Sequence, residues 1–349
     1  MKHNLVIVGF GGMGEWHAHY AKNSDVINLV GVYDIKEERR VYAQQQGIKT
    51  YSSLDEVLAD KEVDIITIAT PNDYHKEIAI KALDAGKNVI SEKPVTTNSK
   101  DLQDMIDASV RNGRIFSVHQ NRRWDSDYLV TKKIYQEKQI GNLFKIESRV
   151  HGSRGIPGDW RGEKVHGGGM LFDWGVHLID QALQVVSDSK VSEIYCHFDN
   201  ITNKEVDDGF RMDITFENGV IYVVEVGTYN FVSLPRVYIL GEMGSAVIRD
   251  WDQNCEFVRC KEWYQSNVTP VVTAAGLTKT MAPRDNLTTE TGTVESIKLD
   301  VHDYYRNFCR AVEGKEEQIV KHDEMMRVIK VIEAGFESVE KNAAIKVSI

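Results

Sequence analysis

Residues 5–14 read Leu-Val-Ile-Val-Gly-Phe-Gly-Gly-Met-Gly and decide the fold of the N-terminal half of the chain. The apolar run predicts a buried strand, and the G-x-G-x-x-G pattern predicts a tight turn into a helix. The first glycine permits the turn, the second lets the backbone approach a pyrophosphate, and the third lets strand and helix pack closely. Unpaired N–H groups at the helix start would bind the phosphates. The expected dinucleotide-binding loop consists of Gly9, Phe10, Gly11, Gly12, Met13 and Gly14.

An aspartate at the end of the second predicted strand supports this interpretation. Asp34 follows Gly14 by 20 residues, where an acid would accept hydrogen bonds from the ribose hydroxyls. A carboxylate there repels a 2′-phosphate, so we expect NAD as the cofactor and NADP as the less favoured one. Lys36, Arg39 and Arg40 lie nearby and weaken this preference, although they also fit the solvated face of a helix. The alternative interpretation of the whole pattern is an ordinary glycine-rich turn beside a strand-end aspartate, without a role in binding a cofactor.

Short apolar runs alternate with amphipathic stretches through the first 120 residues. The alternation predicts parallel strands with helices on both faces, which is a doubly wound Rossmann domain. Strands are expected at residues 5–8, 29–34, 64–69, 88–91 and 115–119, and helices at residues 36–46, 75–85 and 99–112.

The pattern changes after Gln120, where strands follow one another with few helices between them. This arrangement predicts an α/β domain with an open, mostly antiparallel sheet. Strands are expected at residues 144–151, 193–200, 210–217 and 221–229, helices at 126–137, 169–186, 301–313 and 323–342, and a long loop at 262–296. We therefore divide the chain into a Rossmann domain at 1–121 and a substrate-binding domain at 122–299, with the helices of 300–349 expected to pack on the first domain.

Composition limits the kinds of partner. The chain has 349 residues, 42% of them hydrophobic, and a formal net charge of −10. The acidic balance disfavours nucleic acid and membrane surfaces, and no apolar stretch approaches the roughly 20 residues that span a bilayer. The four cysteines (196, 255, 260 and 309) form no C-x-x-C pair. Reduced thiols in a cytoplasmic protein are the expectation.

Further motifs resemble one known family. Ala69-Thr70-Pro71-Asn72 with His75 follows the strand at 64–69, Glu92-Lys93-Pro94 follows the strand at 88–91, and Gln120-Asn121-Arg122-Arg123 closes the first domain. The run Gly167-Gly168-Gly169-Met170-Leu171-Phe172-Asp173-Trp174-Gly175-Val176-His177 comes next. Together these elements resemble the Gfo/Idh/MocA oxidoreductases. The resemblance implies a Rossmann domain followed by an open-sheet α/β domain, with that sheet as the interface of a homo-oligomer.

The residues expected to carry chemistry are Lys93, Asp173 and His177. Lys93 lies at the carboxyl end of a parallel strand, where open α/β sheets bind their ligands. Asp173 and His177 are four residues apart on a predicted helix and would share one face. The resemblance implies that His177 is the general acid/base and that Asp173 binds substrate or orients the histidine. Asp173 would then favour the protonated imidazole, whose reference pKa is about 6.5.

Other interpretations of these residues remain open. Asp173, His177 and Asp180, perhaps with His166, would suit a metal site, although hydride transfer with a lysine at the hydroxyl needs none, and we expect none. Arg122 and Arg123 would line the substrate or pair with carboxylates across the domain interface. Besides the glycine loop and Asp34, the expected cofactor-binding residues are Thr70, Pro71, Asn72, His75, Glu92, Lys93 and Gln120. The expected substrate-binding residues are Lys93, Arg123, Trp160, Arg161, Asp173 and His177.

These features predict an NAD-dependent oxidoreductase that moves a hydride between nicotinamide and a secondary alcohol or ketone of a sugar, glycoside or polyol. A second enzymatic alternative oxidises a sugar transiently to a 3-keto intermediate and reduces it again. An alternative of another class is a non-catalytic sensor that binds NAD and a sugar on the same fold. Lys93, Asp173 and His177 together favour the enzyme, because a sensor has no need of all three.

Overall fold

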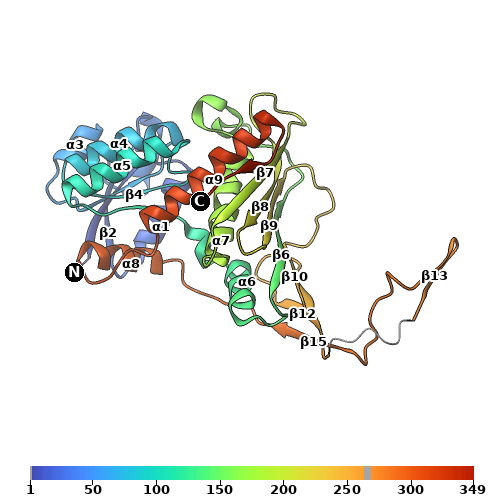
Figure 1. Ribbon diagram of the computed structural model, residues 1–349. Helices are drawn as coiled ribbons and strands as arrows, with labels where there is room; N and C mark the ends of the chain where they lie inside the picture. Colours follow the sequence, from blue (N-terminus) through green and yellow to red (C-terminus); the bar gives the residue numbers. More distant parts are fainter. Residues whose placement is uncertain (1, 263–268) are drawn as a thin grey trace.

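A computed structural model describes residues 2–262 and 269–349, and its N-terminal half is built on a parallel sheet (Figure 1). The strand order is β2-β1-β3-β4-β5, and all strands are parallel, so the order in which strands are added to the sheet reverses between β1 and β3. The strands are β1 (His3–Val8), β2 (Ile27–Tyr33), β3 (Ile65–Ile68), β4 (Asn88–Ser91) and β5 (Phe116–Val118). The helices are α1 (Gly12–Lys22), α2 (Glu37–Gln45), α3 (Leu54–Ala59), α4 (His75–Asp84) and α5 (Ser99–Asn112). The predicted Rossmann fold is confirmed.

The apolar run of β1 forms the centre of this sheet because it is covered on both faces. Leu5, Val6, Ile7 and Val8 are each at most 1% exposed, as expected for a strand between two layers of helices. The carboxyl ends of β1 and β3 flank the point of reversal, where ligands of open α/β sheets bind.

The second half contains a mixed sheet, with strand order β15-β12-β11-β10-β6-β9-β8-β7-β16 in the described residues. All neighbouring pairs are antiparallel except β6 and β9. The strands are β6 (Leu143–His151), β7 (Val191–Asp199), β8 (Gly209–Phe216), β9 (Ile221–Gly227), β10 (Val237–Gly241), β11 (Gly244–Ile248), β12 (Cys255–Cys260), β15 (Thr289–Val294) and β16 (Ile345–Lys346). The predicted open, mostly antiparallel sheet is confirmed.

Four longer helices follow the first half in the described residues: α6 (Ser126–Glu137), α7 (Val176–Val185), α8 (Asp303–Val312) and α9 (His322–Lys341). Helix α9 packs on α7 and β7 and also contacts α5 of the first half. Helix α8 lies on the first half, where Arg306 pairs with Asp25 at 3.0 Å. The C-terminal segment therefore touches both sheets, and the exact domain boundaries remain a prediction.

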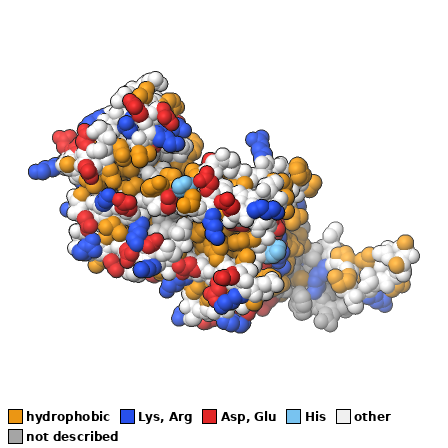
Figure 2. Space-filling model, turned by 90° about the horizontal axis from the view of Figure 1, so that it is seen from above, with side chains coloured by type: hydrophobic (Ala, Val, Ile, Leu, Met, Phe, Trp, Pro, Cys, Tyr) orange, Lys and Arg blue, Asp and Glu red, His pale blue; other side chains and the backbone are white. Residues whose placement is uncertain are grey.

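The predicted loop at 262–296 is wrong over its last part. Residues 289–294 form β15 and pair with β12 along its whole length. Threonine and valine favour strands because their branched side chains fit a pleated surface, and a partner strand at the sheet edge completes the hydrogen bonds. A short hairpin of β13 (Val271–Thr273) and β14 (Gly276–Thr278) stands away from the sheet (Figures 1 and 2). Residues 263–268 of the predicted loop lie outside the described residues.

No helix within residues 2–262 and 269–349 has the length and apolar character needed to cross a membrane.

Candidate active site

The glycine loop between β1 and α1 has the geometry of a phosphate cradle. Gly9 has a φ of +94°, and a Cβ there would lie 2.6 Å from the Ala69 carbonyl oxygen. A Cβ on Gly14 would collide with the Gly9 carbonyl oxygen. Gly11 and Gly12, in contrast, have no atom within 4 Å of a hypothetical Cβ, so their backbone faces open space. Gly11 caps α1 without a side-chain hydrogen bond, which leaves first-turn N–H groups free for an anion.

Asp34 lies beside this loop and organises it. Its Oδ2 accepts the Phe10 N–H at 2.7 Å, and its Oδ1 accepts the Lys36 N–H at 2.8 Å. The Phe10 ring is fully buried, so this residue contributes to the loop through its backbone. Arg39 pairs with Glu15 at 3.4 Å, and the Arg40 guanidinium donates to the Asp34 carbonyl at 2.6 Å. Both arginines therefore have partners within the protein.

The loop after β3 connects the two halves of the chain. Asn72 donates from its amide to the Gly167 carbonyl at 3.0 Å. The ring nitrogens of His75 lie 3.0 Å from the Pro94 carbonyl oxygen and 2.9 Å from that of Thr70. Burial lowers the pKa of His75, and a neutral ring can donate to only one of these two carbonyls, so it bonds one loop and packs against the other.

Two predicted cofactor residues carry buried polar atoms that the described residues leave without a partner. These atoms are the Thr70 hydroxyl and the side-chain amide oxygen (Oε1) of Gln120. A buried polar atom without a hydrogen bond is costly and points to a bound ligand or water. Together with the open backbone at Gly11 and Gly12, these atoms fit a dinucleotide at the carboxyl edge of the sheet.

Lys93 and Asp173 form an ion pair between the two halves. The Lys93 ammonium donates to the Asp173 carboxylate at 3.0 Å and to its backbone carbonyl at 2.8 Å. Both side chains are largely buried, with 14% and 16% exposed. Arg161 adds a second positive charge, with its Nε 3.3 Å from the same carboxylate oxygen. Burial acts to raise the pKa of Asp173, but the charges of Lys93 and Arg161 outweigh it and hold this pKa below its usual value.

The predicted contact between Asp173 and His177 is not present. Residues Leu171–Gly175 form a π-helical turn, and α7 begins only at Val176. Both side chains nevertheless lie near Lys93: Asp173 accepts from its ammonium, and burial and the charge of Lys93 both lower the pKa of His177. Asp173 faces Lys93, and among the described residues the buried Nδ1 of His177 has no hydrogen-bond partner.

The pKa of His177 shifts downward overall, whereas Asp173 was expected to favour the protonated ring. The ring is 5% exposed. Burial lowers its pKa well below the usual value, and the positive charges of Lys93 and Arg122 lower it further. His177 is accordingly a neutral imidazole at neutral pH.

The glycine run before this helix serves close packing within the protein. A Cβ on Gly167 would lie 2.6 Å from the Thr97 side chain, and one on Gly168 would collide with the Arg161 carbonyl oxygen. Gly169 has a φ of +106° and lies against the Asp207 carboxylate. Protein atoms thus occupy the space beside these three glycines.

Arg123 has a structural position instead of the predicted place in a substrate wall. Its guanidinium binds both oxygens of Asp180, at 2.8 and 2.6 Å, and binds Glu324 of α9 at 2.7 Å. The side chain is 6% exposed. Arg123 therefore fits the other interpretation drawn from the sequence, in which it pairs with carboxylates. The same bonds commit Asp180 to a guanidinium, which disfavours its role in the alternative metal site.

Trp160 and Arg161 remain accessible near Asp173. Both are partly exposed, and the Arg161 guanidinium lies 4.6 Å from the centre of the Trp160 ring. Trp174 is contacted by Arg122 at 4.6 Å, as an ordinary cation–π pair. His166 pairs with Asp73 at 3.1 Å.

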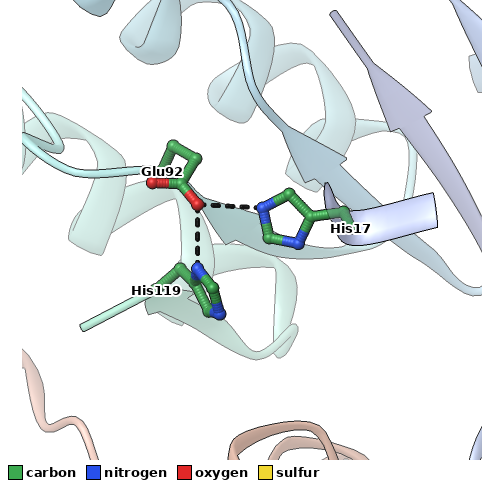
Figure 3. Close-up of side chains that lie close together, drawn as sticks. All are labelled: His17, Glu92 and His119. Carbon is green, nitrogen blue, oxygen red and sulfur yellow. Dashed lines mark hydrogen bonds and ion pairs between the residues drawn. The ribbon is translucent and has the colours of Figure 1, made fainter. Parts of the chain in front are cut away.

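Two histidines around Glu92 were missed by the sequence interpretation. Glu92 was expected to bind the cofactor, but its carboxylate is buried between His17 of α1 and His119 after β5 (Figure 3). His17 lies three residues beyond Gly14, and His119 ends a parallel strand. A search for polar residues at the carboxyl ends of parallel strands would have found His119.

Comparisons with known proteins agree with this geometry. Residues 3–120 match the family described as "Oxidoreductase family, NAD-binding Rossmann fold", and residues 128–247 match the "GFO/IDH/MocA C-terminal domain". The chain belongs to the Gfo/Idh/MocA oxidoreductase family. The resemblance drawn from the sequence motifs is therefore confirmed.

Three similar proteins place this Gfo/Idh/MocA member among its relatives. A solved NAD-binding protein from Listeria innocua is 47% identical, with a TM-score of 0.96 and 99% of both chains covered. The scyllo-inositol 2-dehydrogenase (NADP(+)) IolW of Bacillus subtilis is 26% identical, with 84% of this chain and 81% of the relative covered. An uncharacterized oxidoreductase of Schizosaccharomyces pombe is 34% identical over 162 residues, and the chain spans only 44% of its length.

The Asp207 carboxyl group beside the glycine run should make the folding stability of this Gfo/Idh/MocA chain depend on pH. Its Oδ2 accepts the Leu171 N–H at 2.8 Å, and burial raises its pKa to about 7. Because the unfolded value is about 3.9, the native state binds this proton more tightly. The associated stability is complete below about pH 4 and is lost as pH rises through about 7. The contribution of Asp207 to the melting temperature should fall between about pH 4 and 7 and level off above pH 7, and Asp207→Asn should remove most of that fall.

The neighbouring carboxylate provides the control. Burial of Asp208 raises its pKa, but N–H donors from Ile201, Thr202 and Asn203 outweigh this and lower it. Asp208→Asn should therefore retain the fall in melting temperature between about pH 4 and 7. If melting temperature changes with pH equally in the wild type and in Asp207→Asn, Asp207 is ionised throughout this range.

Proposed function

We propose that this protein is an NAD-dependent oxidoreductase that transfers a hydride between nicotinamide and a secondary alcohol or ketone of a sugar, glycoside or polyol. The observation that carries the proposal is the Lys93–Asp173 pair, which lies at the carboxyl edge of the Rossmann sheet together with a buried, neutral His177. An ammonium and a neutral base near one point are what the oxidation of a hydroxyl requires. A bound nicotinamide would supply the two-electron acceptor.

The protein residues would handle the hydroxyl proton. Lys93 would donate a hydrogen bond to the reacting oxygen, and its positive charge would lower the pKa of the alcohol. Asp173 would hold the ammonium in place, because it accepts from Lys93 through its carboxylate and its carbonyl. His177 would take the proton on its neutral ring. The low pKa of this histidine makes it a weak base, so the acidification of the alcohol by Lys93 is an essential part of the proposal.

Asp34 supports NAD over NADP. Its carboxylate lies at the end of β2 beside the glycine loop, where a 2′-phosphate would meet a negative charge. Asp34→Ser removes this charge and should shift the ratio of kcat/KM for NADP to that for NAD upward by roughly 10-fold, about 1.4 kcal/mol of lost repulsion. Dissociation constants for the two oxidised cofactors, measured by tryptophan fluorescence, provide the check.

The matched control is Asp73→Ser, a change at an acid outside the predicted ribose position. It should leave the cofactor ratio unchanged. Wild-type protein that binds NADP at least as tightly as NAD would contradict this role for Asp34. The Lys36 or Arg39 side chain would then be the candidate partner of the phosphate.

A panel of sugars, glycosides and polyols tests the reaction as a whole. The purified protein is incubated with each compound and either NAD or NADP, and formation of reduced nicotinamide is followed by its absorbance. Turnover with a member of the panel supports the proposal. Binding of NAD and sugar without any exchange of isotope between labelled substrate and bound cofactor would favour the non-catalytic sensor.

A further inference from the structure

We propose that His17, Glu92, His119 and Tyr305, here called the Glu92 network, form a buried positioning device that holds the Lys93 turn in its working geometry. The inference rests on the proposed function of Lys93. None of these four residues is placed in contact with substrate; the network acts through the backbone of Lys93.

The contacts converge on one carboxylate (Figure 3). Glu92 Oε1 lies 2.9 Å from His17 Nε2 and 2.8 Å from His119 Nδ1. Glu92 Oε2 accepts the backbone N–H of Lys93 at 3.1 Å. The network side chains are buried, and Tyr305 of α8 contacts the second ring nitrogen of His17. Both oxygens of Glu92 are therefore occupied by protein groups.

The protonation states of the network residues determine which atoms donate the hydrogen bonds. Burial raises the pKa of Glu92, but the two histidines outweigh it, and the carboxylate stays ionised with a pKa well below its usual value. Burial lowers the pKa of His17 and raises that of Tyr305, so both are neutral. An anionic Glu92 can only accept. Hence His17 donates from Nε2 and His119 from Nδ1, which leaves His17 Nδ1 to accept from the Tyr305 hydroxyl.

A metal ion does not explain this arrangement. Two ligand atoms at about 2.0–2.1 Å from a tetrahedral zinc would be separated by about 3.3 Å. The 2.8 and 2.9 Å separations at Glu92 Oε1 are instead those of charge-assisted hydrogen bonds.

The network connects the elements that build the proposed active site. His17 belongs to the helix that begins at the glycine loop, Glu92 and Lys93 follow β4, and His119 follows β5. Tyr305 brings in the C-terminal helix α8. Fixing the Lys93 N–H directs the side chain across to Asp173 on the other half of the chain. A displacement of about 1 Å at such a group can cost up to about 100-fold in rate.

The first test needs no substrate. We expect Glu92→Gln to release Lys93 from Asp173 and therefore to raise the pKa of the Asp173 carboxyl group, measured by its 13C chemical shift during a pH titration. Simple loss of a nearby negative charge would instead lower this pKa, so the sign of the change is diagnostic. Lys93→Met is the positive control for a rise, and Glu15→Gln, a change at a partly exposed carboxylate of α1, should have no effect. An unchanged or lowered pKa in Glu92→Gln overturns the proposal.

The second test uses isosteres and protects against a Glu92 variant that fails to fold. Glutamine places its amide N–H where histidine has Nε2, and asparagine places it where histidine has Nδ1. His17→Gln and His119→Asn should therefore keep the bond to Glu92 and keep kcat within about threefold of wild type. His17→Asn and His119→Gln should lose it and lower kcat by roughly 10-fold, with unchanged NAD affinity. Equal effects of both replacements at each position would overturn the assigned donors.

A double-mutant cycle separates this inference from the proposed function. If Glu92 acts through Lys93, Glu92→Gln should lower kcat by roughly 10-fold alone but by less than about twofold in the Lys93→Met background. Additive losses would show that Glu92 only stabilises the fold. If Lys93→Met has wild-type turnover, the function proposed for Lys93 fails, whereas the Asp173 titration still reports whether the network positions its side chain.

Discussion

Replacing Lys93 by methionine is expected to lower turnover by roughly 100-fold or more. The change keeps much of the apolar length of the side chain and removes the ammonium that faces Asp173 at 3.0 Å. A positioned group of this kind contributes about 100-fold or more through proton transfer and charge stabilisation. Steady-state kcat with the best substrate of the panel is the measurement. The affinity for NAD, measured by fluorescence, should change by less than about threefold, because the expected phosphate and ribose contacts lie at the glycine loop and Asp34.

The control for Lys93 is Lys61→Met, which removes an exposed lysine from a loop of the same domain. It should leave kcat, NAD affinity and melting temperature at wild-type values. Turnover of Lys93→Met at the wild-type rate would show that the ammonium only joins the two halves of the chain. In that case its loss should appear as a lower melting temperature alone.

His177→Ala is expected to lower kcat/KM for oxidation by roughly 100-fold and to remove the acidic limb of the pH profile. Oxidation requires the neutral ring, and burial together with Lys93 and Arg122 holds the pKa of His177 well below its usual value. The wild-type rate should therefore be level at neutral pH and should fall only at pH values clearly below 6.5. The decisive measurement is kcat/KM for oxidation against pH in the wild type and in the variant.

Two further variants sharpen this prediction. His166→Gln changes a partly exposed histidine that pairs with Asp73, and it should leave the profile intact. Lys93→Met removes a positive charge near His177 and should move the acidic limb of its residual activity to higher pH. If His177→Ala retains the wild-type limb, another group accepts the proton, and the role given to His177 is wrong.

The N-terminal fold could be predicted in detail because its signals are local. The run at residues 5–8, the glycine pattern and the regular exchange of strands and helices each lie within a few residues of one another. The predicted strands agree with β1 to β5, with differences only at their ends. The threonine-rich strand β15 was not predicted, because a polar edge strand gains its stability from the neighbour it pairs with.

The sequence predicted which residues lie in the site better than it predicted which of them contact one another. Lys93, Asp173 and Arg161 do lie together, but the partner of Asp173 proved to be Lys93 and not His177. The pair joins residues 80 positions apart in the sequence, so no local pattern indicates it. The position of Arg123 depends on carboxylates 57 and 201 residues away in sequence, which no local pattern reveals.

The Rossmann half and the phosphate loop could be derived from the sequence, since spacing within one strand–turn–helix unit dictates these features, and the residues proposed for chemistry came from the motifs that resemble the family. The charges and orientations of those residues depend on tertiary contacts. The low pKa of His177 and the enclosure of Glu92 between His17 and His119 arise from burial and from charges that segments far apart in sequence bring together. Burial and long-range charge act through space, and the order of residues along the chain does not encode them locally.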